Sequence, residues 1–142
     1  MNSKNNIKLI DGGLAVDDRG TVRFVNDFDF RGVKRFYQVE NHRKGFIRAW
    51  HGHKKEGKYV YVSSGTALVG VVDLKTQKVK KFILSDKNPQ VLWIPANHAN
   101  GFMNLEDNTD ILFFSTSTLQ QSLGDDIRFP YDQWNIWDIE YR

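Results

Sequence analysis

The chain has 142 residues, of which 40% are hydrophobic and 26% charged, a balance typical of a globular domain large enough to bury a core. It has no apolar run long enough to cross a bilayer, no apolar secretory signal within residues 1–6, and no cysteine for disulfides or thiolate metal sites. Its net charge of +3 is spread over small separate clusters, whereas nucleic-acid binding usually needs a continuous basic stripe. We therefore expect one cytoplasmic domain over residues 1–142 that binds neither nucleic acid nor a membrane.

Short β-prone runs separated by turn residues follow one another along most of the chain. The strands that we expect are Ile7–Ile10, Thr21–Asn26, Val33–Val39, Gly45–Trp50, Lys58–Ser63, Thr66–Asp73, Val79–Leu84, Gln90–Ile94, Gly101–Asn104 and Asp110–Ser115. Ten strands without a long segment of helical period predict an all-β sandwich or barrel. The less regular C-terminal part predicts a short helix near Tyr131–Ile136. Such a barrel can hold one small ligand at its mouth.

Two histidines stand in the run that follows the fourth predicted strand. His51 and His53 are two residues apart, so in an extended strand their imidazoles project to the same side. Lys58 begins the next strand and shares its face with Val60 and Val62. A lysine on the same face as two valines is expected to point into a pocket. These three polar side chains indicate either a metal site or an acid/base site.

The spacing favours proton transfer over a metal. The pair His51 and His53 matches the first half of a metal-binding cupin motif, but Glu56 comes one position too early to be its carboxylate ligand. Asn100 stands where the remaining histidine ligand would be, and Lys58 adds a positive charge. We therefore expect a site without metal.

The same residues suit removal of a proton from a carbon next to a carbonyl. Histidine is the usual base near neutral pH. Lys58 or Arg48 could supply the positive charge where the enolate oxygen develops.

The motifs resemble those of the cupin-fold dTDP-4-dehydrorhamnose 3,5-epimerases. The resemblance extends from about Asp17 to Trp137 and is carried by Asp18-Arg19-Gly20, Val39-Glu40-Asn41-His42, Arg48-Ala49-Trp50-His51, Glu56-Gly57-Lys58-Tyr59-Val60 and Trp93–Phe102. In the epimerase motif, glutamine stands in place of Glu56. Two other segments, His51-Gly52-His53-Lys54 and Asp126-Ile127-Arg128, resemble motifs of the related dTDP-4-dehydro-6-deoxyglucose 3,4-ketoisomerases.

The resemblance implies a single-domain, cupin-like jelly-roll β-barrel. It also implies a homodimer that acts on a nucleotide-linked deoxysugar without metal or organic cofactor, as in surface polysaccharide biosynthesis. Carried over, His51 is the base, Lys58 stabilises the enolate and Arg48 contacts the substrate. Arg19 matches a residue that contacts the diphosphate, reaching across the dimer. In the ketoisomerases both histidines shuttle protons, which adds His53.

Further candidate site residues come from the same motifs and from positions where this chain differs from the epimerase pattern. Asn41 belongs to the motif Val39-Glu40-Asn41-His42, and Asn100 replaces the histidine of an epimerase motif, so we expect both to contact substrate. The epimerase tyrosine that delivers the second proton falls near Leu119, so Tyr37 and Tyr131 are candidate replacements and His98 is a candidate acid. We expect His98 and Asn100 to lie in a turn.

The missing tyrosine leaves three interpretations open. Without the second acid, epimerisation at one carbon or a 3,4-keto shift is easier to support than inversion at two carbons. A cupin that binds the sugar nucleotide without catalysis is the third possibility.

Overall fold

The computed structural model describes residues 3–142, whose regular structure consists almost entirely of β-strands. A 3-10 helix, η1 (Ser3–Asn5), opens the chain and one short α-helix, α1 (Leu119–Leu123), lies near its end. The strands are β1 (Lys8–Asp11), β2 (Gly13–Asp17), β3 (Gly20–Phe24), β4 (Arg35–Asn41), β5 (Ile47–His53), β6 (Lys58–Ser64), β7 (Thr66–Asp73), β8 (Val79–Ser85), β9 (Gln90–Ile94), β10 (His98–Asn104), β11 (Thr109–Ser115) and β12 (Ile127–Arg128). No helix in this part of the chain is long and apolar enough to span a bilayer.

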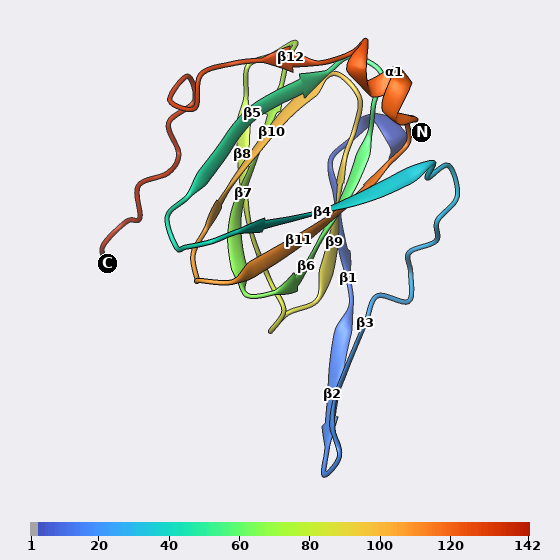
Figure 1. The fold of residues 1–142 in the computed structure, drawn as a ribbon, viewed down its shortest axis with the longest axis vertical. Coiled ribbons are helices and arrows are strands. Elements are labelled where there is room, and N and C mark those ends of the chain that lie inside the picture. The colour runs from blue at the N-terminus through green and yellow to red at the C-terminus, as the bar shows by residue number, and fades with distance from the viewer. Residues whose placement is uncertain (1–2) are drawn as a thin grey trace.

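Two antiparallel five-stranded sheets face each other (Figure 1). The first sheet has the order β1-β9-β6-β11-β4, and the second sheet has the order β12-β5-β10-β7-β8. From β4 to β11 the chain passes repeatedly from one sheet to the other, which is the connectivity of a jelly roll. The predicted all-β, cupin-like jelly roll is confirmed. Its strands form two separate hydrogen-bonded sheets.

The main core lies between the two sheets. On β6, Val60 and Val62 are buried together with Lys58, whereas Tyr59 and Tyr61 on the opposite face are only partly buried. Side chains of the second sheet, such as Val69 and Phe102, complete the same apolar cluster. The prediction that Lys58 shares an inward face with two valines is therefore confirmed.

A second apolar cluster lies on the outer face of the second sheet, beneath the C-terminal segment. Trp50 and Trp137 pack against each other there, and the indole N–H of each donates to the carbonyl oxygen of Tyr131, at 3.1 and 2.9 Å. The helix expected near Tyr131–Ile136 is wrong, since residues 131–134 form turns. The carbonyl that would begin its hydrogen bonds serves the two tryptophans instead.

The α-helix forms earlier, at Leu119–Leu123. Thr118 accepts a hydrogen bond from the backbone N–H of Gln121, whose side chain accepts one in return from the N–H of Thr118. This capping box gives the short helix a defined start.

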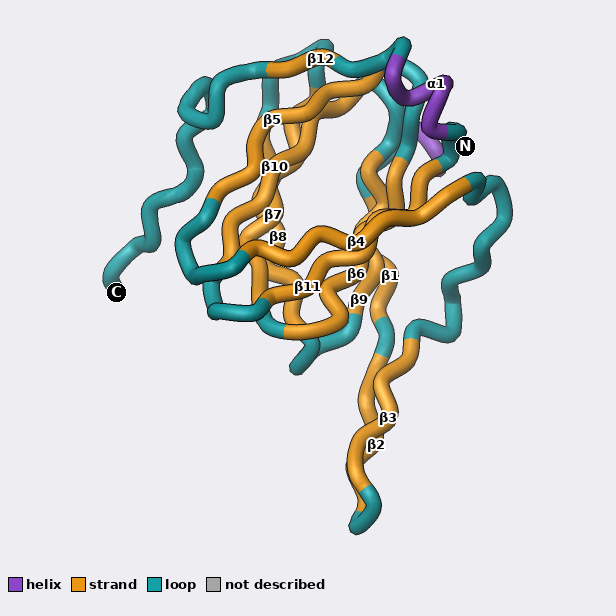
Figure 2. The backbone as a smooth tube through the Cα atoms, in the orientation of Figure 1, coloured by secondary structure: helices purple, strands orange, loops and turns teal. Residues whose placement is uncertain are grey.

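β2 and β3 form a hairpin that projects from the two sheets (Figure 2). The sequence predicts only its second strand, because the run of Asp11, Gly12 and Gly13 is typical of a break between strands. The hairpin turns at Asp18 and Arg19, just before Gly20, which has φ of 146°.

β5 and β10 are both longer than the sequence predicts. β5 continues to His53, so both histidines lie in a strand as the alternation argument requires. The turn expected at His98 and Asn100 is wrong, because both residues belong to β10. The left-handed conformation falls on Asn97 instead, with φ of 64°.

Candidate active site

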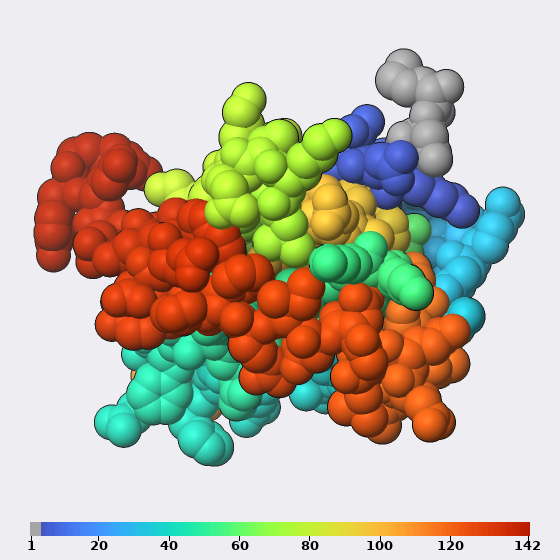
Figure 3. Space-filling view, turned by 90° about the horizontal axis from the view of Figure 1, so that it is seen from above, coloured from blue at the N-terminus to red at the C-terminus, as the bar shows by residue number. Residues whose placement is uncertain are grey.

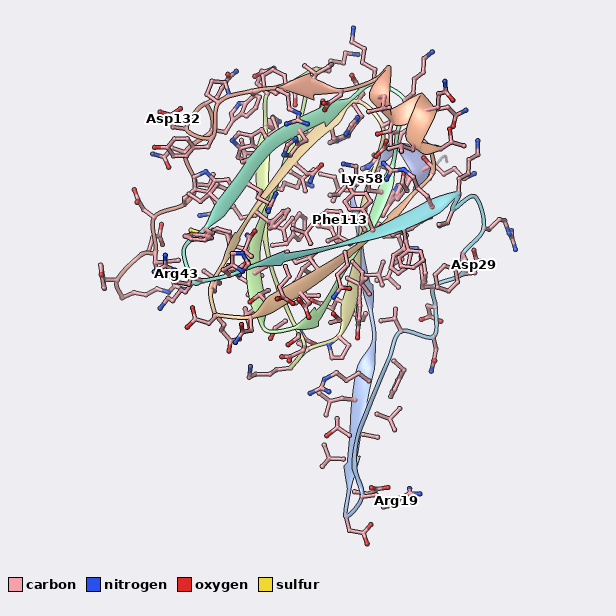
Figure 4. The ribbon with its side chains drawn as sticks, viewed as in Figure 1. Arg19, Asp29, Arg43, Lys58, Phe113 and Asp132 are labelled. Carbon is pink, nitrogen blue, oxygen red and sulfur yellow. The ribbon has the colours of Figure 1, made fainter. Side chains whose placement is uncertain are left out.

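A cavity of about 270 Å³ lies between the two sheets. β4, β5, β6 and β10 contribute its polar side chains, namely Arg35, Tyr37, Arg48, His51, His53, Lys58 and Asn100. The segment from α1 to β12 supplies a further wall with Ser122, Leu123, Asp126 and Arg128. Figure 3 shows the chain from α1 onward, in orange to red, running across this end of the molecule. Figure 4 shows Lys58 and Phe113 inside, between the sheets.

An irregularity in β5 brings Arg48 to the same cavity as the histidines. His51 and His53 share a face by simple alternation, but Arg48 is three residues before His51 and would face the other way. In the pairing with β10, Asn100 lies opposite His51 and Phe102 opposite Arg48, so β5 has one extra residue over this stretch. This β-bulge turns Arg48 toward the cavity.

His51 is neutral in the resting site. Burial, reinforced by the positive charges of Arg128 and Lys58, lowers the pKa of His51 to about 4. Arg128 is its direct neighbour because β12 pairs with β5 at these two residues. A neutral imidazole has a lone pair that can accept a proton.

His53 is held in one tautomer by the backbone. Its Nδ1 lies 2.6 Å from the carbonyl oxygen of Asp125, which can only accept, so Nδ1 carries the proton. Burial lowers the pKa of His53, which keeps the ring neutral and leaves Nε2 without a proton. That nitrogen lies 4.0 Å from Oε2 of Glu56.

Lys58 is a buried ammonium with a buried counter-ion. Its Nζ lies 3.6 Å from Oε2 of Glu56 and 5.8 Å from the ring centre of Phe113. Burial lowers the pKa of Lys58, and the negative charge of Glu56 opposes that shift. The cavity therefore brings the neutral imidazole of His51 together with the amine of Lys58, which Glu56 helps to keep protonated.

Arg48 is oriented by two asparagines. Its Nε donates to Oδ1 of Asn41 at 2.7 Å, and Nδ2 of Asn41 donates to Oδ1 of Asn104 at 3.2 Å. Asn41 was expected to contact substrate. The structure places it behind Arg48, buried and outside the cavity lining.

The other candidates from the sequence divide between cavity and periphery. Tyr37 and Asn100 line the cavity, and Tyr37 stacks on Phe113 with ring centres 5.0 Å apart. His98 is buried beyond the lining, with Nδ1 2.9 Å from the carbonyl oxygen of Ala96. Arg19 lies at the hairpin tip, remote from Lys58 (Figure 4), where it pairs with Asp17 at 2.6 Å.

Sequence reasoning missed the role of Asp125. Its carboxylate accepts the backbone N–H groups of Lys54, Lys55 and Glu56 at 2.8, 2.9 and 3.0 Å. Partial burial favours the neutral acid, but these donors hold the pKa of Asp125 below its usual value. The nearby Asp126-Ile127-Arg128 motif was the available signal that this segment belongs to the site.

The residues offer poor ligands for a metal ion. Within residues 3–142, no group of three His, Asp or Glu side chains comes together in an arrangement that could hold one. Asn100, an amide, is the neighbour of His51 across the strand pair, and the Glu56 carboxylate, 4.0 Å from His53, is also paired with Lys58.

Comparison with known proteins identifies the family. A sequence model described as dTDP-4-dehydrorhamnose 3,5-epimerase matches residues 5–137. The spore coat polysaccharide biosynthesis protein SpsL of Bacillus subtilis (strain 168) is 28% identical over 137 residues, covering 89% of this chain and 91% of SpsL.

Two solved structures have a similar fold. The dTDP-4-dehydrorhamnose 3,5-epimerase from Sulfolobus tokodaii is 28% identical with a TM-score of 0.76, over 92% of this chain and 81% of that one. A 3,4-ketoisomerase from Helicobacter canadensis is 21% identical with a TM-score of 0.71, over 91% of this chain and 94% of that one, and shows the shared fold. Because the family match covers nearly the whole chain, the protein belongs to the dTDP-4-dehydrorhamnose 3,5-epimerase family.

Proposed function

We propose that the protein is a sugar-nucleotide epimerase acting on a nucleotide-linked 4-keto-6-deoxysugar, without a metal ion. The observation that carries the proposal is the shared cavity of His51 and Lys58, in which a neutral base faces a buried ammonium. Proton removal next to a ketone needs both groups. The family membership supplies the class of substrate.

In the proposed reaction, His51 takes the proton from a carbon next to the C4 ketone. The electron pair of the broken C–H bond moves toward the C4 oxygen and gives an enolate, which the Lys58 ammonium stabilises. The enolate collapses when a proton returns to the same carbon from the opposite face. Tyr37 lines the cavity, and because burial raises the pKa of its hydroxyl, it stays protonated and can be that donor.

Arg128 links substrate binding to the strength of the base. Its charge helps to keep the pKa of His51 low in the empty site. A nucleotide diphosphate bound beside Arg128 would offset this charge and raise the pKa of His51. The base then becomes stronger when substrate is present.

The relatives support a role in making surface polysaccharide. SpsL is named for spore coat polysaccharide biosynthesis, and a 31% identical relative of Haloferax volcanii, which matches over 96 residues, is named a probable low-salt glycan biosynthesis epimerase. We propose that the product of this enzyme is a deoxysugar donor for such a polymer.

We further propose a homodimer in which Arg19 reaches the substrate diphosphate of the other protomer. The hairpin that carries Arg19 projects from the sheets, and it exposes Val16 and Val22 by 68% and 65%. Apolar side chains so exposed would be covered by a second copy.

A 3,4-keto shift is the second candidate, favoured by one observation. Both His51 and His53 line the cavity, so two imidazoles are available to move a proton between neighbouring atoms of the sugar.

Proton NMR of the product from dTDP-4-keto-6-deoxyglucose tests the proposal. Epimerisation changes the ring coupling constants at C3 or C5, whereas a keto shift moves the carbonyl from C4 to C3. We expect an epimer. The 3-keto product would replace the first candidate by the second, and unchanged substrate in the presence of bound protein would leave only a binding function.

A further inference from the structure

Glu56 is a buried carboxylate that the proposed chemistry does not use directly. It lies in the loop between β5 and β6, and its side chain has no exposed surface. Neither of its oxygens has a hydrogen-bond partner among the described residues. Three nitrogens surround it instead, with Nζ of Lys58 at 3.6 Å, Nη2 of Arg35 at 3.9 Å and Nε2 of His53 at 4.0 Å.

Lys58 depends on this carboxylate for its charge. Its side chain is only 6% exposed, and a buried ammonium without a counter-ion tends to lose its proton. Among the described residues, Glu56 is the one carboxylate within 4.0 Å of Nζ. The other titratable or charged groups that line the cavity with Lys58 are Arg35 and Tyr37 on β4, Arg48, His51 and His53 on β5, and Asp126 and Arg128 from the segment after α1.

Burial and the positive charge of Arg35 oppose a charge on Lys58. Asp126 attracts the ammonium, but more weakly than Glu56 does. The glutamine of the motif that this chain resembles would carry no charge, so the carboxylate at position 56 is a feature of this chain.

We propose that Glu56 is a positioning residue that keeps Lys58 protonated and directed into the cavity, so that an ammonium is present when negative charge develops on the C4 oxygen of the substrate. The proposal rests on the proposed function of Lys58. Glu56 itself would touch neither the substrate nor the reacting atoms.

The variant Glu56→Gln removes the charge and keeps the shape. Glu56→Asp is the matched control because it keeps the charge in a shorter side chain. The ¹³Cε resonance of Lys58 is followed from pH 6 to pH 11 in the wild type and in both variants, without ligand. We expect Glu56→Gln to lower the Lys58 pKa by about one unit or more and Glu56→Asp to stay near the wild type. An unchanged Lys58 titration in Glu56→Gln would overturn the proposal.

Solvent-deuterium exchange into dTDP-4-keto-6-deoxyglucose tests the catalytic consequence. We expect the alkaline limit of kcat in Glu56→Gln to move to lower pH by as much as the Lys58 pKa does, with about a tenfold loss of rate per unit of that shift on the alkaline side of the profile and recovery at lower pH. A purely structural role would lower the rate equally across the profile, and that result would also overturn the proposal. Absence of exchange in the wild type would contradict the proposed function instead, while the NMR titration would still decide the role of Glu56.

A third variant keeps the proposal testable if Glu56→Gln folds poorly. If the cause is an unpaired buried ammonium, then Glu56→Gln with Lys58→Met regains stability relative to Glu56→Gln alone in urea unfolding. Failure to regain it would show that Glu56 serves the fold and not Lys58.

Discussion

The chemistry of single residues is set by the charges that line one cavity. His51, Lys58 and Arg128 line one cavity, so each positive charge makes the imidazole harder to protonate. The resulting neutral base and charged lysine are the two states that enolisation requires. Substrate charge would then act on the base through Arg128.

At this scale we predict how His51 titrates. Its pKa of about 4 means that the base is available above that value and is lost as pH falls, so kcat/KM should decline below about pH 4. Arg128→Met removes one of the charges and should raise the His51 pKa, as should binding of dTDP. The ¹H–¹³C resonance of the His51 ring reports both changes. Arg31→Met, at an exposed site, serves as control, and an equal titration in all three proteins would contradict the electrostatic explanation.

Elements position these residues through contacts that are distant in sequence. Asp125, after α1, binds the backbone of the loop that carries Glu56 and fixes the ring of His53 through its carbonyl oxygen. β12 then pairs with β5 and places Arg128 beside His51. The C-terminal segment thus holds the loop between β5 and β6 and also forms a wall of the cavity.

The corresponding prediction concerns Asp125→Ala. Loss of three charge-assisted hydrogen bonds to backbone N–H groups should reduce the free energy of unfolding by about 2–3 kcal/mol at neutral pH. The pKa of Asp125 is lower in the folded protein than its usual value. The stabilisation by Asp125 is therefore fully present above the usual carboxyl pKa, and it is lost as pH falls through the lowered pKa of the folded state. Urea unfolding at pH 7 and pH 3 measures it. Asp29→Ala removes a single exposed hydrogen bond from a backbone N–H and should reduce the free energy of unfolding far less. Equal losses in the two variants would contradict a stabilising role for the Asp125 hydrogen bonds.

The sequence could predict those parts of the site that follow from simple alternation. Lys58 with Val60 and Val62, and His51 with His53, need only a period of two. Arg48 reaches the cavity through a β-bulge, which depends on how β5 pairs with β10 and has no local signal. The same holds for Asp125, whose three backbone partners lie about seventy residues earlier in the chain.

At the scale of the whole molecule, the hairpin of β2 and β3 is the feature that one chain does not explain. It carries exposed Val16 and Val22 away from the sheets and ends at Arg19, far from the cavity of its own chain. A second copy that covers the hairpin would give both the apolar surface and the arginine a role.

We therefore predict that Val16→Asp with Val22→Asp converts a dimer into monomers in analytical ultracentrifugation. Arg19→Ala should leave the dimer intact and raise KM, because it removes a diphosphate contact without touching the apolar surface. A wild-type protein that sediments as a monomer would refute the proposed dimer. An unchanged KM in Arg19→Ala would remove Arg19 from the site.

The most direct test of the central claim is solvent-deuterium exchange into dTDP-4-keto-6-deoxyglucose by the wild type and by His51→Asn, with dTDP affinity measured alongside. The wild type should incorporate deuterium next to the C4 ketone. His51→Asn should be about 10²–10⁴-fold slower with dTDP binding preserved, since only the base is lost. A wild type that binds dTDP and exchanges no deuterium, or a His51→Asn variant as fast as the wild type, would contradict the assignment of His51 as the base.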